Sequence, residues 1–405
     1  MTVPIDAEIA GSAMSSRQRV FTGNVLWLSM VSLLTDLSSE MIYPLLPFFL
    51  TGVLGAGPAI LGVIEGIAES TSSLLKLASG WWSDRIGRRK VLVLIGYGIA
   101  SVMRPLIALT TAPWQVLVIR FSDRVGKGIR TAPRDALIAE SVAPEQRGTA
   151  FGYHRAADHA GAVLGPVVAA SILLLLPGRY RLVFALAAVP ALLSMIVLAA
   201  RVRETAAGAP PKAEEFRGFA GLGKRFYAFL AVVLVFTLGN ATDAFLLLRA
   251  QQTGVPLALV PILWAAFHVS KMLWNIVGGR LADRIGPRPA IVAGWLVYAA
   301  TYAGFAVVNA SWQVWALFAV YGLFYGLTEA PEKALVAATA PPGQRGAAFG
   351  AYHFSVGLAA LPASVLFGVL WERVSMVAAF GTGAALALLA AAGLMFIPSG
   401  TKQRE

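Results

Sequence analysis

Long apolar runs with very few charged residues dominate this chain of 405 residues. Three of them, Leu182 to Ala200, Ala290 to Thr328 and Val374 to Thr401, carry no charge, and each reaches the roughly 20 residues that cross a bilayer as a helix. Only 13% of all residues are charged and 57% are hydrophobic, against about 25% charged residues in a soluble domain. The sequence therefore predicts an all-α integral membrane protein.

Lysine and arginine gather in alternate connections between the apolar runs. By the positive-inside rule, the connections that hold them lie in the cytoplasm. The basic connections are those at Arg17 and Arg19, Arg85 to Lys90, Arg147, Arg201 to Arg225, Arg284 and Arg288, Arg345, and Lys402 and Arg404. Both termini and the middle of the chain then share the cytoplasmic side, which requires an even number of spans in each half.

Six helices in each half fit the length of the chain. We expect a cytoplasmic tail at 1–19, a first bundle at 20–200, a polar linker at 201–225, a second bundle at 226–398 and a tail at 399–405. The location expected for such a chain is the inner or plasma membrane. The expected spans cover residues 20–50, 57–79, 91–112, 113–142, 148–177, 179–201, 226–253, 255–280, 288–309, 312–340, 345–370 and 374–398.

Composition also limits the classes of partner. The first 19 residues lack the apolar core of a signal peptide, so we expect them to remain as a tail. The absence of cysteine excludes disulfides and thiolate metal sites, and we expect neither a metal nor a cofactor. The net charge of +12 follows from cytoplasmic loops and does not indicate a nucleic-acid partner. The sequence does not determine the oligomeric state, and we take a monomer as the expectation.

Two stretches of the chain recur half a chain apart. GWWSDRIGRRK at 80–90 resembles GGRLADRIGPRP at 278–289, with Asp84 and Asp283 lying 199 residues apart. PRDALIAESVAPEQRGTAFG from Pro133 aligns without a gap with PEKALVAATAPPGQRGAAFG from Pro331, 198 residues further on. Two long matches at nearly one spacing indicate a duplicated unit, a common plan in transporters that bind substrate between their halves.

The first recurring stretch resembles the signature of the major facilitator superfamily, which lies in the loop between helices two and three. The second copy has Pro287 where the first has Arg88. The resemblance implies two pseudo-symmetric six-helix bundles and a gate at the cytoplasmic ends. The residues implied in gating are Gly80, Asp84, Arg85, Gly87, Arg88, Arg89, Gly279, Asp283, Arg284, Gly286, Arg134, Arg147 and Arg345.

A second motif bears on the subtype of transporter. Gly161, Gly165 and Pro166 resemble the GxxxGP motif of the fifth helix in antiporters of this superfamily. The residues that follow are Val-Val-Ala-Ala and not a further glycine pair. GxxxG alone is also a common helix-packing motif, and that interpretation stays open.

Acidic residues in the first expected helix are candidates for proton coupling. Asp36 and Glu40 are one helical turn apart, and the stretch from Glu40 to Pro44 resembles the acid-then-proline pattern of multidrug antiporters. Glu40 is the leading proton carrier, because a carboxyl group in a partly desolvated cavity can take up and release a proton. The alternative is a structural ion pair with Arg124 or Arg155.

The fourth expected helix is the richest in charge. Because an ionisable side chain at the middle of the bilayer costs roughly 2.5–3.5 kcal/mol, its charges must face inward. Arg124 and Lys127 are interpreted as cavity residues with Asp123 as their counter-ion, whereas Arg134 is assigned to the cytoplasmic gate. Glu65, Glu69 and Lys76 on the second helix receive no transport role. The other expected cavity residues are Arg155, Asp158, Tyr43, Asn240, Asp243, Trp264, His268, Lys271 and Glu329.

The sequence thus predicts a proton-coupled secondary transporter that exports small amphipathic compounds by alternating access. Trp264, His268 and Lys271 share one helical face and offer an aromatic platform with adjacent donors. The alternative cargo is an anionic metabolite, a siderophore or a lysolipid, which the basic residues of the cavity favour. An intramembrane enzyme or receptor is disfavoured because no spacing of nucleophile and base is present.

Overall fold

The computed structural model describes residues 23–86, 88–143, 146–204, 221–340 and 344–397, and these residues form helices and short connections without a strand. In the first half the helices are α2 (Asn24–Ile42), α3 (Leu46–Phe48), α4 (Pro58–Ile86), α5 (Arg89–Leu106), α6 (Pro113–Glu140), α7 (Arg147–Leu175), α8 (Tyr180–Leu186) and α9 (Ala188–Arg201). In the second half they are α10 (Gly223–Gly239), α11 (Ala244–Gln252), α12 (Val260–Ile285), α13 (Pro287–Val307), α14 (Ser311–Thr339), α15 (Arg345–Arg373) and α16 (Met376–Phe396).

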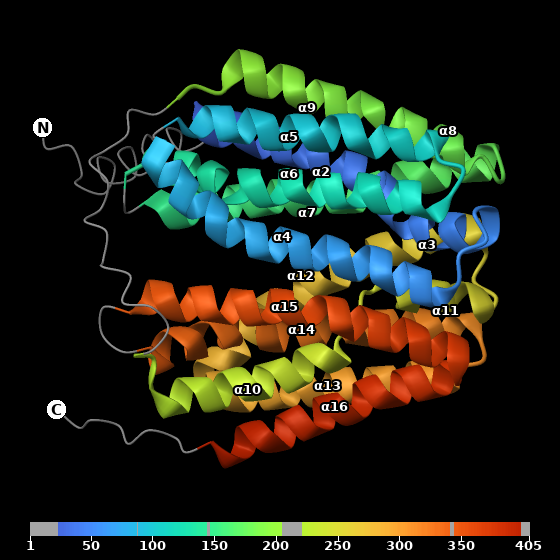
Figure 1. The fold of residues 1–405 in the computed structure, drawn as a ribbon, viewed down its shortest axis with the longest axis vertical. Helices are drawn as coiled ribbons and strands as arrows, with labels where there is room; N and C mark the ends of the chain where they lie inside the picture. The colour runs from blue at the N-terminus through green and yellow to red at the C-terminus, as the bar shows by residue number, and fades with distance from the viewer. Residues whose placement is uncertain (1–22, 87, 144–145, 205–220, 341–343, 398–405) are drawn as a thin grey trace, which may run out of the picture.

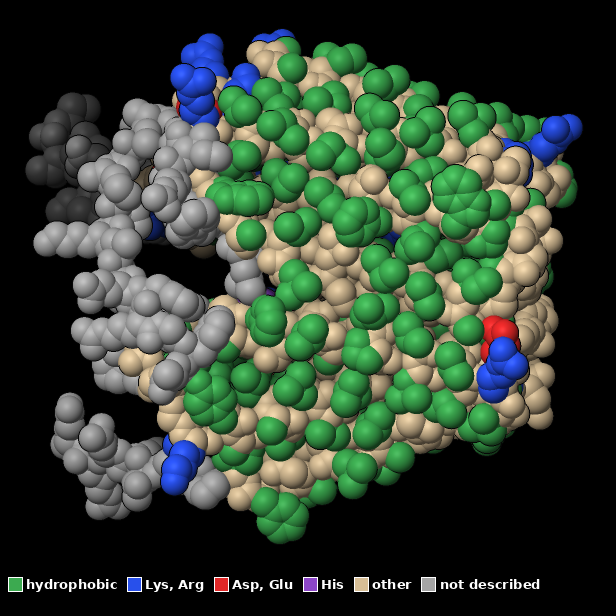
Figure 2. Space-filling model, in the orientation of Figure 1, with side chains coloured by type: hydrophobic (Ala, Val, Ile, Leu, Met, Phe, Trp, Pro, Cys, Tyr) green, Lys and Arg blue, Asp and Glu red, His purple; other side chains and the backbone are tan. Residues whose placement is uncertain are grey.

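Most of these helices are suited to a bilayer. Within the described ranges, nine segments are long and apolar enough to cross a membrane. The three other long helices, α4, α6 and α14, have 29, 28 and 29 residues and carry more polar or charged side chains. On the face seen in Figure 2, apolar side chains are spread over both halves and charged side chains lie near the two ends, as lipid contact requires. The protein is thus an all-helical, multi-pass membrane protein.

The helices form two bundles that lie one above the other in Figure 1, with the first half in blue to green and the second in yellow to red. The bundles meet where α4 packs along α15 and where α7 packs along α12. We call the end at which α9 ends and α10 begins the linker face; α2 begins and α16 ends at the same end (Figure 1).

The two halves are closed at the face opposite the linker face. There the Glu372 carboxylate on α15 accepts a hydrogen bond of 3.0 Å from the Ala59 backbone N–H in the first turn of α4. A carboxylate at this position is also attracted by the partial positive charge of the helix N-terminus. Deeper in the molecule, the Ser70 hydroxyl donates to the Gly357 carbonyl at 2.6 Å. These contacts join the halves from the far face to about the middle of α4.

Beyond Ser70 the two halves separate toward the linker face. Figure 1 shows α4 and α15 diverging there, and Figure 2 shows the surface hollowed between the halves at the same end. The described residues therefore form a state that is closed at one face and open at the linker face.

Two of the long membrane segments change course inside the bundle. The first passes from α2 into a 3₁₀ turn at Tyr43–Leu45, where Pro44 has no N–H to offer. The other is the seventh expected span, 226–253. It is broken between Gly239 and Ala244, and this break separates α10 from α11. The breaks face each other, because the Tyr43 hydroxyl lies 3.3 Å from the Thr242 hydroxyl. Interrupted helices of this kind are where transporters commonly bind substrate or ions.

Candidate functional site

Glu40 on α2 contacts the opposite half of the protein. The Trp264 indole N–H on α12 donates a hydrogen bond of 2.8 Å to Glu40 Oε2. The His268 Nε2, one turn further along α12, lies 4.0 Å from the same oxygen. No ion pair joins Glu40 to Arg124 or Arg155 among the residues that the structure describes. The expected proton carrier and the expected aromatic platform are therefore in direct contact.

A continuous wall of aromatic side chains extends from Glu40 into the second half. The Tyr43 and Trp264 ring centroids are 5.1 Å apart, and Trp264 lies at the same distance from Phe267. Phe267 stacks on Tyr321 at 5.3 Å and meets the edge of Tyr325 at 5.8 Å. In this wall α12 supplies Trp264 and Phe267, and α14 supplies Tyr321 and Tyr325. Each pair is three or four positions apart and therefore shares one helical face.

Asp243 lies at the far end of this wall, at the break before α11. Its two carboxylate oxygens accept hydrogen bonds from the Tyr321 hydroxyl at 2.9 Å and the Tyr325 hydroxyl at 3.0 Å. The Lys271 ammonium lies over the Tyr325 ring, 3.6 Å from its centroid. We call Tyr43, Trp264, Phe267, Tyr321 and Tyr325, with Glu40 and Asp243, the aromatic box. The box places two carboxylates along a mostly apolar wall, and Lys271 lies against one of its rings.

Buried ion pairs connect four helices of the first half. The Arg120 guanidinium on α6 donates two hydrogen bonds, of 2.9 and 2.6 Å, to the Glu65 carboxylate on α4. Arg104 on α5 donates one of 2.8 Å to Asp123 on α6 and one of 2.9 Å to the Thr35 carbonyl on α2. All four charged side chains are at most 7% exposed. A small cavity beside them is lined by Ser39, Ile42, Arg104, Ile107, Ile119, Arg120 and Asp123.

Arg124 and Lys127 point to a different part of the first half. The buried Arg124 Nε has no hydrogen-bond partner in the described structure. Lys127 interacts electrostatically with Arg124, Lys76, Glu69 and Asp36. The expected counter-ion, Asp123, accepts a hydrogen bond from Arg104 instead, because α5 brings that guanidinium to the same depth of the bundle. Arg124 and Lys127 thus form a basic region without a carboxylate at hydrogen-bonding distance among the described residues.

The other expected cavity residues are more dispersed. Asp158 lies 3.6 Å from His154 Nε2, and no ion pair joins it to Arg155 among the described residues. Glu329 pairs with Lys333 at 3.6 Å, one turn along α14. Asn240 ends α10, where its backbone N–H bonds the Thr237 carbonyl. Asp36 lies near enough to Asp158, Lys127 and Glu40 to interact with them electrostatically.

The residues implied in gating lie near the linker face. Gly87 is outside the described residues, and the side chains of Asp84, Arg85 and Arg345 are also outside the described part. Gly80, Asp84 and Arg85 belong to the last two turns of α4. In the second copy, Gly279, Asp283 and Arg284 lie in the last turns of α12, and Gly286 ends this helix with a φ of 89°, which favours glycine.

The basic residues near this gate bond within the first half. Arg89 pairs with Glu140, and its backbone N–H donates to Glu204 at 3.0 Å. Arg134 pairs with its neighbour Asp135 at 2.8 Å, and the Arg147 guanidinium donates to the Ala139 carbonyl at 3.1 Å. Arg88 is exposed just before α5. These are the pairings that the basic residues make while the linker face is open.

Gly161, Gly165 and Pro166 pack α7 directly against the acidic face of α2. A methyl group added at Gly165 would lie 2.6 Å from the Leu37 carbonyl oxygen and 3.0 Å from Glu40 Cβ. One added at Gly161 would lie 3.0 Å from Asp36 Cβ. The motif therefore fixes the helix that carries both candidate proton carriers.

We expect Gly165→Ala to destabilise the protein by about 1–3 kcal/mol, because the added methyl must push backbone apart. The measurement is the free energy of unfolding in detergent. Gly152→Ala on the same helix is the matched control, since nothing lies within 4 Å of its added methyl. This control should be neutral or slightly stabilising. Equal stability of the two variants would contradict the packing role of the motif.

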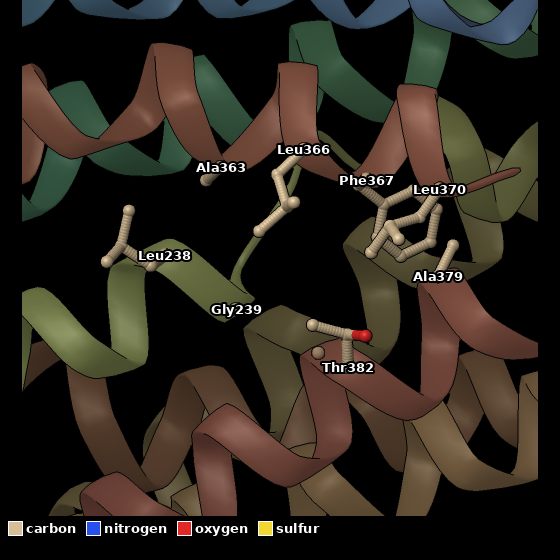
Figure 3. A pocket seen from close by; sticks show the side chains of 9 residues that line it. Leu238, Gly239, Ala363, Leu366, Phe367, Leu370, Ala379 and Thr382 are labelled. Carbon is tan, nitrogen blue, oxygen red and sulfur yellow. The ribbon is translucent and has the colours of Figure 1, made fainter. Parts of the chain in front are cut away.

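A second pocket is separate from these groups. It lies between α10, α15 and α16 and is lined by Leu238, Gly239, Ala363, Leu366, Phe367, Leu370, Ala379, Thr382 and Gly383 (Figure 3). Thr382 is the only polar side chain in this lining. The pocket therefore has no group with which to hold a charged or strongly polar ligand.

Three charged residues in the network of the first half were missed as site residues by sequence reasoning. Glu65 was left without a role, Arg120 was given no partner, and Arg104 was not considered. A usable signal existed for Arg104, since it is the one charge deep inside the expected helix 91–112. Glu332 in the second half was also not chosen as a site residue. Its carboxylate accepts hydrogen bonds from Tyr352 at 2.5 Å and Trp295 at 3.3 Å.

Comparison with known proteins gives matches over nearly the whole chain. The profile of the Major Facilitator Superfamily matches residues 28–270 and 228–405. An uncharacterised transporter of this type from Methanocaldococcus jannaschii, MJ1317, is 34% identical over 389 residues, which cover 95% of this chain and 97% of that protein. Multidrug resistance protein MdtH from Photorhabdus laumondii is 27% identical over 142 residues, or 35% of each chain.

The fold also matches solved structures. The nucleoside transporter NupG aligns with a TM-score of 0.81 and 13% identity, covering 93% of this chain and 100% of that chain. At this identity the similarity concerns the fold alone. Together with the profile match and the duplicated halves, it shows that the chain belongs to the major facilitator superfamily and is a membrane transporter, not an enzyme.

Proposed function

We propose that this protein is a proton-coupled secondary transporter that exports small amphipathic compounds by alternating access. The observation that carries the proposal is the Glu40 carboxylate, which is held across the two halves by Trp264 and lies close to His268. A group that can bind a proton, placed where the halves meet, can link protonation to the movement of those halves.

The coupling follows from the chemistry of the hydrogen bond. A charged carboxylate accepts the Trp264 N–H more strongly than a neutral carboxyl group does. Protonation of Glu40 therefore weakens the contact between α2 and α12, and loss of the proton restores it. Asp36, one turn away on the same helix, is the second candidate carrier.

The orientation and direction of transport rest on two further observations. The positive-inside rule assigns the linker face to the cytoplasm, so the open state described above would face inward. MdtH, which is similar to a third of this chain, is named as a multidrug resistance protein. The inward-facing state gives cargo access from the cytoplasmic side of the inner or plasma membrane, and the similarity to MdtH supports release outside.

A second candidate function is transport of an organic anion. The observation in its favour is the basic region of Arg124 and Lys127, in which the buried Arg124 Nε has no partner in the described structure. Arginine is well suited to binding carboxylates and phosphates. In this candidate the cargo would bind in the first half and not at the aromatic box.

The test is proton flux in liposomes that contain the purified protein and a trapped pH-sensitive dye. With an acidic lumen, external ethidium should enter in exchange for protons and make the lumen more alkaline. Protein-free liposomes serve as the control. If ethidium moves no protons but benzenesulfonate does, the anion candidate replaces the first one. If neither compound moves protons above the control, proton coupling is wrong for these cargo classes.

A further inference from the structure

The second half of the protein already holds a cation on the aromatic box. The Lys271 ammonium lies 3.6 Å from the centroid of the Tyr325 ring, nearer than Arg130 to Tyr97 at 4.3 Å or Arg120 to Tyr43 at 5.7 Å. The hydroxyl of the same tyrosine donates to Asp243. A positive charge is thus placed against the π-face of a ring whose other end bonds a carboxylate.

This lysine is not bound as the arginines of the first half are. Arg120 and Arg104 donate hydrogen bonds of 2.6–2.9 Å to Glu65 and Asp123. Among the described residues, no carboxylate oxygen lies within 4.0 Å of the Lys271 ammonium. Its electrostatic partners are Glu329, Asp243, Glu40 and the like-charged Arg155. Ring contact, not a close ion pair, therefore locates the ammonium.

Among the residues that the structure describes, the two carboxylates of the aromatic box have only neutral donors at hydrogen-bonding distance. Asp243 accepts from two tyrosines and Glu40 from one tryptophan. His268 Nε2, beside Glu40, is buried and makes no hydrogen bond in the described structure. Lys127, Arg124 and Arg104 act on Glu40 from the first half, whereas Lys271 is the cation beside Asp243. The Asp243 end of the box is therefore the end that attracts a further positive charge, and the rings beside it suit an apolar body around that charge.

We propose that the aromatic box is a binding site for amphipathic organic cations, and that Lys271 occupies it in the unloaded state as a tethered competitor. An arriving cation takes the place of the ammonium on Tyr325. The flexible lysine stem allows the ammonium to move away toward Glu329, a carboxylate that it would then share with Lys333. This inference rests on the proposed transport function and specifies its substrate class.

The test measures binding of tetraphenylphosphonium to purified protein in detergent by isothermal titration calorimetry. Lys271→Met removes the competitor, and it should tighten binding by roughly tenfold, in the range that a desolvated cation–π contact provides. Asp243→Asn should weaken binding by a similar factor. Lys224→Met is the matched control, because this exposed lysine at the start of α10 carries the same charge in the same half and has no ring contact among the described residues, and its affinity should stay at the wild-type value.

Two results would overturn the inference: Lys271→Met that binds tetraphenylphosphonium no better than wild type, or equal tightening in Lys271→Met and Lys224→Met. If Lys271→Met does not fold, Tyr325→Leu tests the same site, since losing the ring should weaken binding, and unchanged affinity would contradict the proposal. These measurements need no proton gradient. Loss of proton flux with intact binding would therefore reject the coupling mechanism and leave the cation site standing.

Discussion

Arg120→Met is expected to lower the free energy of unfolding by about 3–5 kcal/mol, because it leaves the Glu65 carboxylate buried without its partner. The two side chains are only 7% and 5% exposed, and two hydrogen bonds join them between α6 and α4. The measurement is denaturant unfolding in detergent, followed by tryptophan fluorescence. Few single substitutions elsewhere in the chain should approach this loss.

The double variant Glu65→Met/Arg120→Met is the control for this expectation. It replaces both charges with apolar side chains of similar length, so no charge of the pair stays buried alone, and most of the lost stability should return. The double-mutant cycle then isolates the interaction between the two residues. A coupling free energy near zero would show that the pair does not hold α4 and α6 together.

The helix order was predictable because a lipid environment leaves the backbone few alternatives to helices. The expected spans 113–142 and 148–177 correspond to α6 at Pro113–Glu140 and α7 at Arg147–Leu175. The expected span 226–253 is instead divided into α10 and α11. That break depends on contacts from other helices, such as the tyrosines that bond Asp243, and these contacts have no local signal in the sequence.

The candidate site was predictable in its parts but not in its assembly. Glu40 and Trp264 were selected for separate reasons, one as an acid in a motif and the other as part of a helical face. Their contact spans 224 positions and the interface between the halves, which a single sequence does not place. The partner of Asp123 was missed because Arg120 and Arg124 are nearer in sequence than Arg104, which reaches it from the neighbouring helix.

The cost of placing an ionisable side chain at the middle of the bilayer also applies to Arg104, although from the sequence it was considered only for the fourth helix. A lone arginine deep in an apolar span must find a partner inside the bundle. Asp123 and the Thr35 carbonyl are those partners. Asp123 and Arg104 therefore hold the helices of the first half together, whereas Arg124 and Lys127 remain the candidates for a role in the cavity.

Glu40→Gln is expected to abolish accumulation driven by a pH gradient while exchange of cargo for cargo continues. Glutamine keeps the size of the side chain and an oxygen that can accept the Trp264 N–H, but it cannot carry a proton. One pH unit corresponds to about 1.4 kcal/mol, so one-for-one exchange with protons sustains roughly a tenfold concentration ratio per unit. This ratio should fall to one in the variant, as measured with a radiolabelled cation in liposomes.

The matched control is Glu372→Gln, the same chemical change at the closed face, where the side chain bonds the Ala59 N–H. This variant should still accumulate cargo, since glutamine can accept the same bond and no proton carrier is lost. Asp36→Asn separates the two candidate carriers one turn apart. Gradient-driven accumulation that survives in Glu40→Gln and disappears in Asp36→Asn would move the coupling role to Asp36. The Trp264 contact would then hold the halves together without sensing the proton.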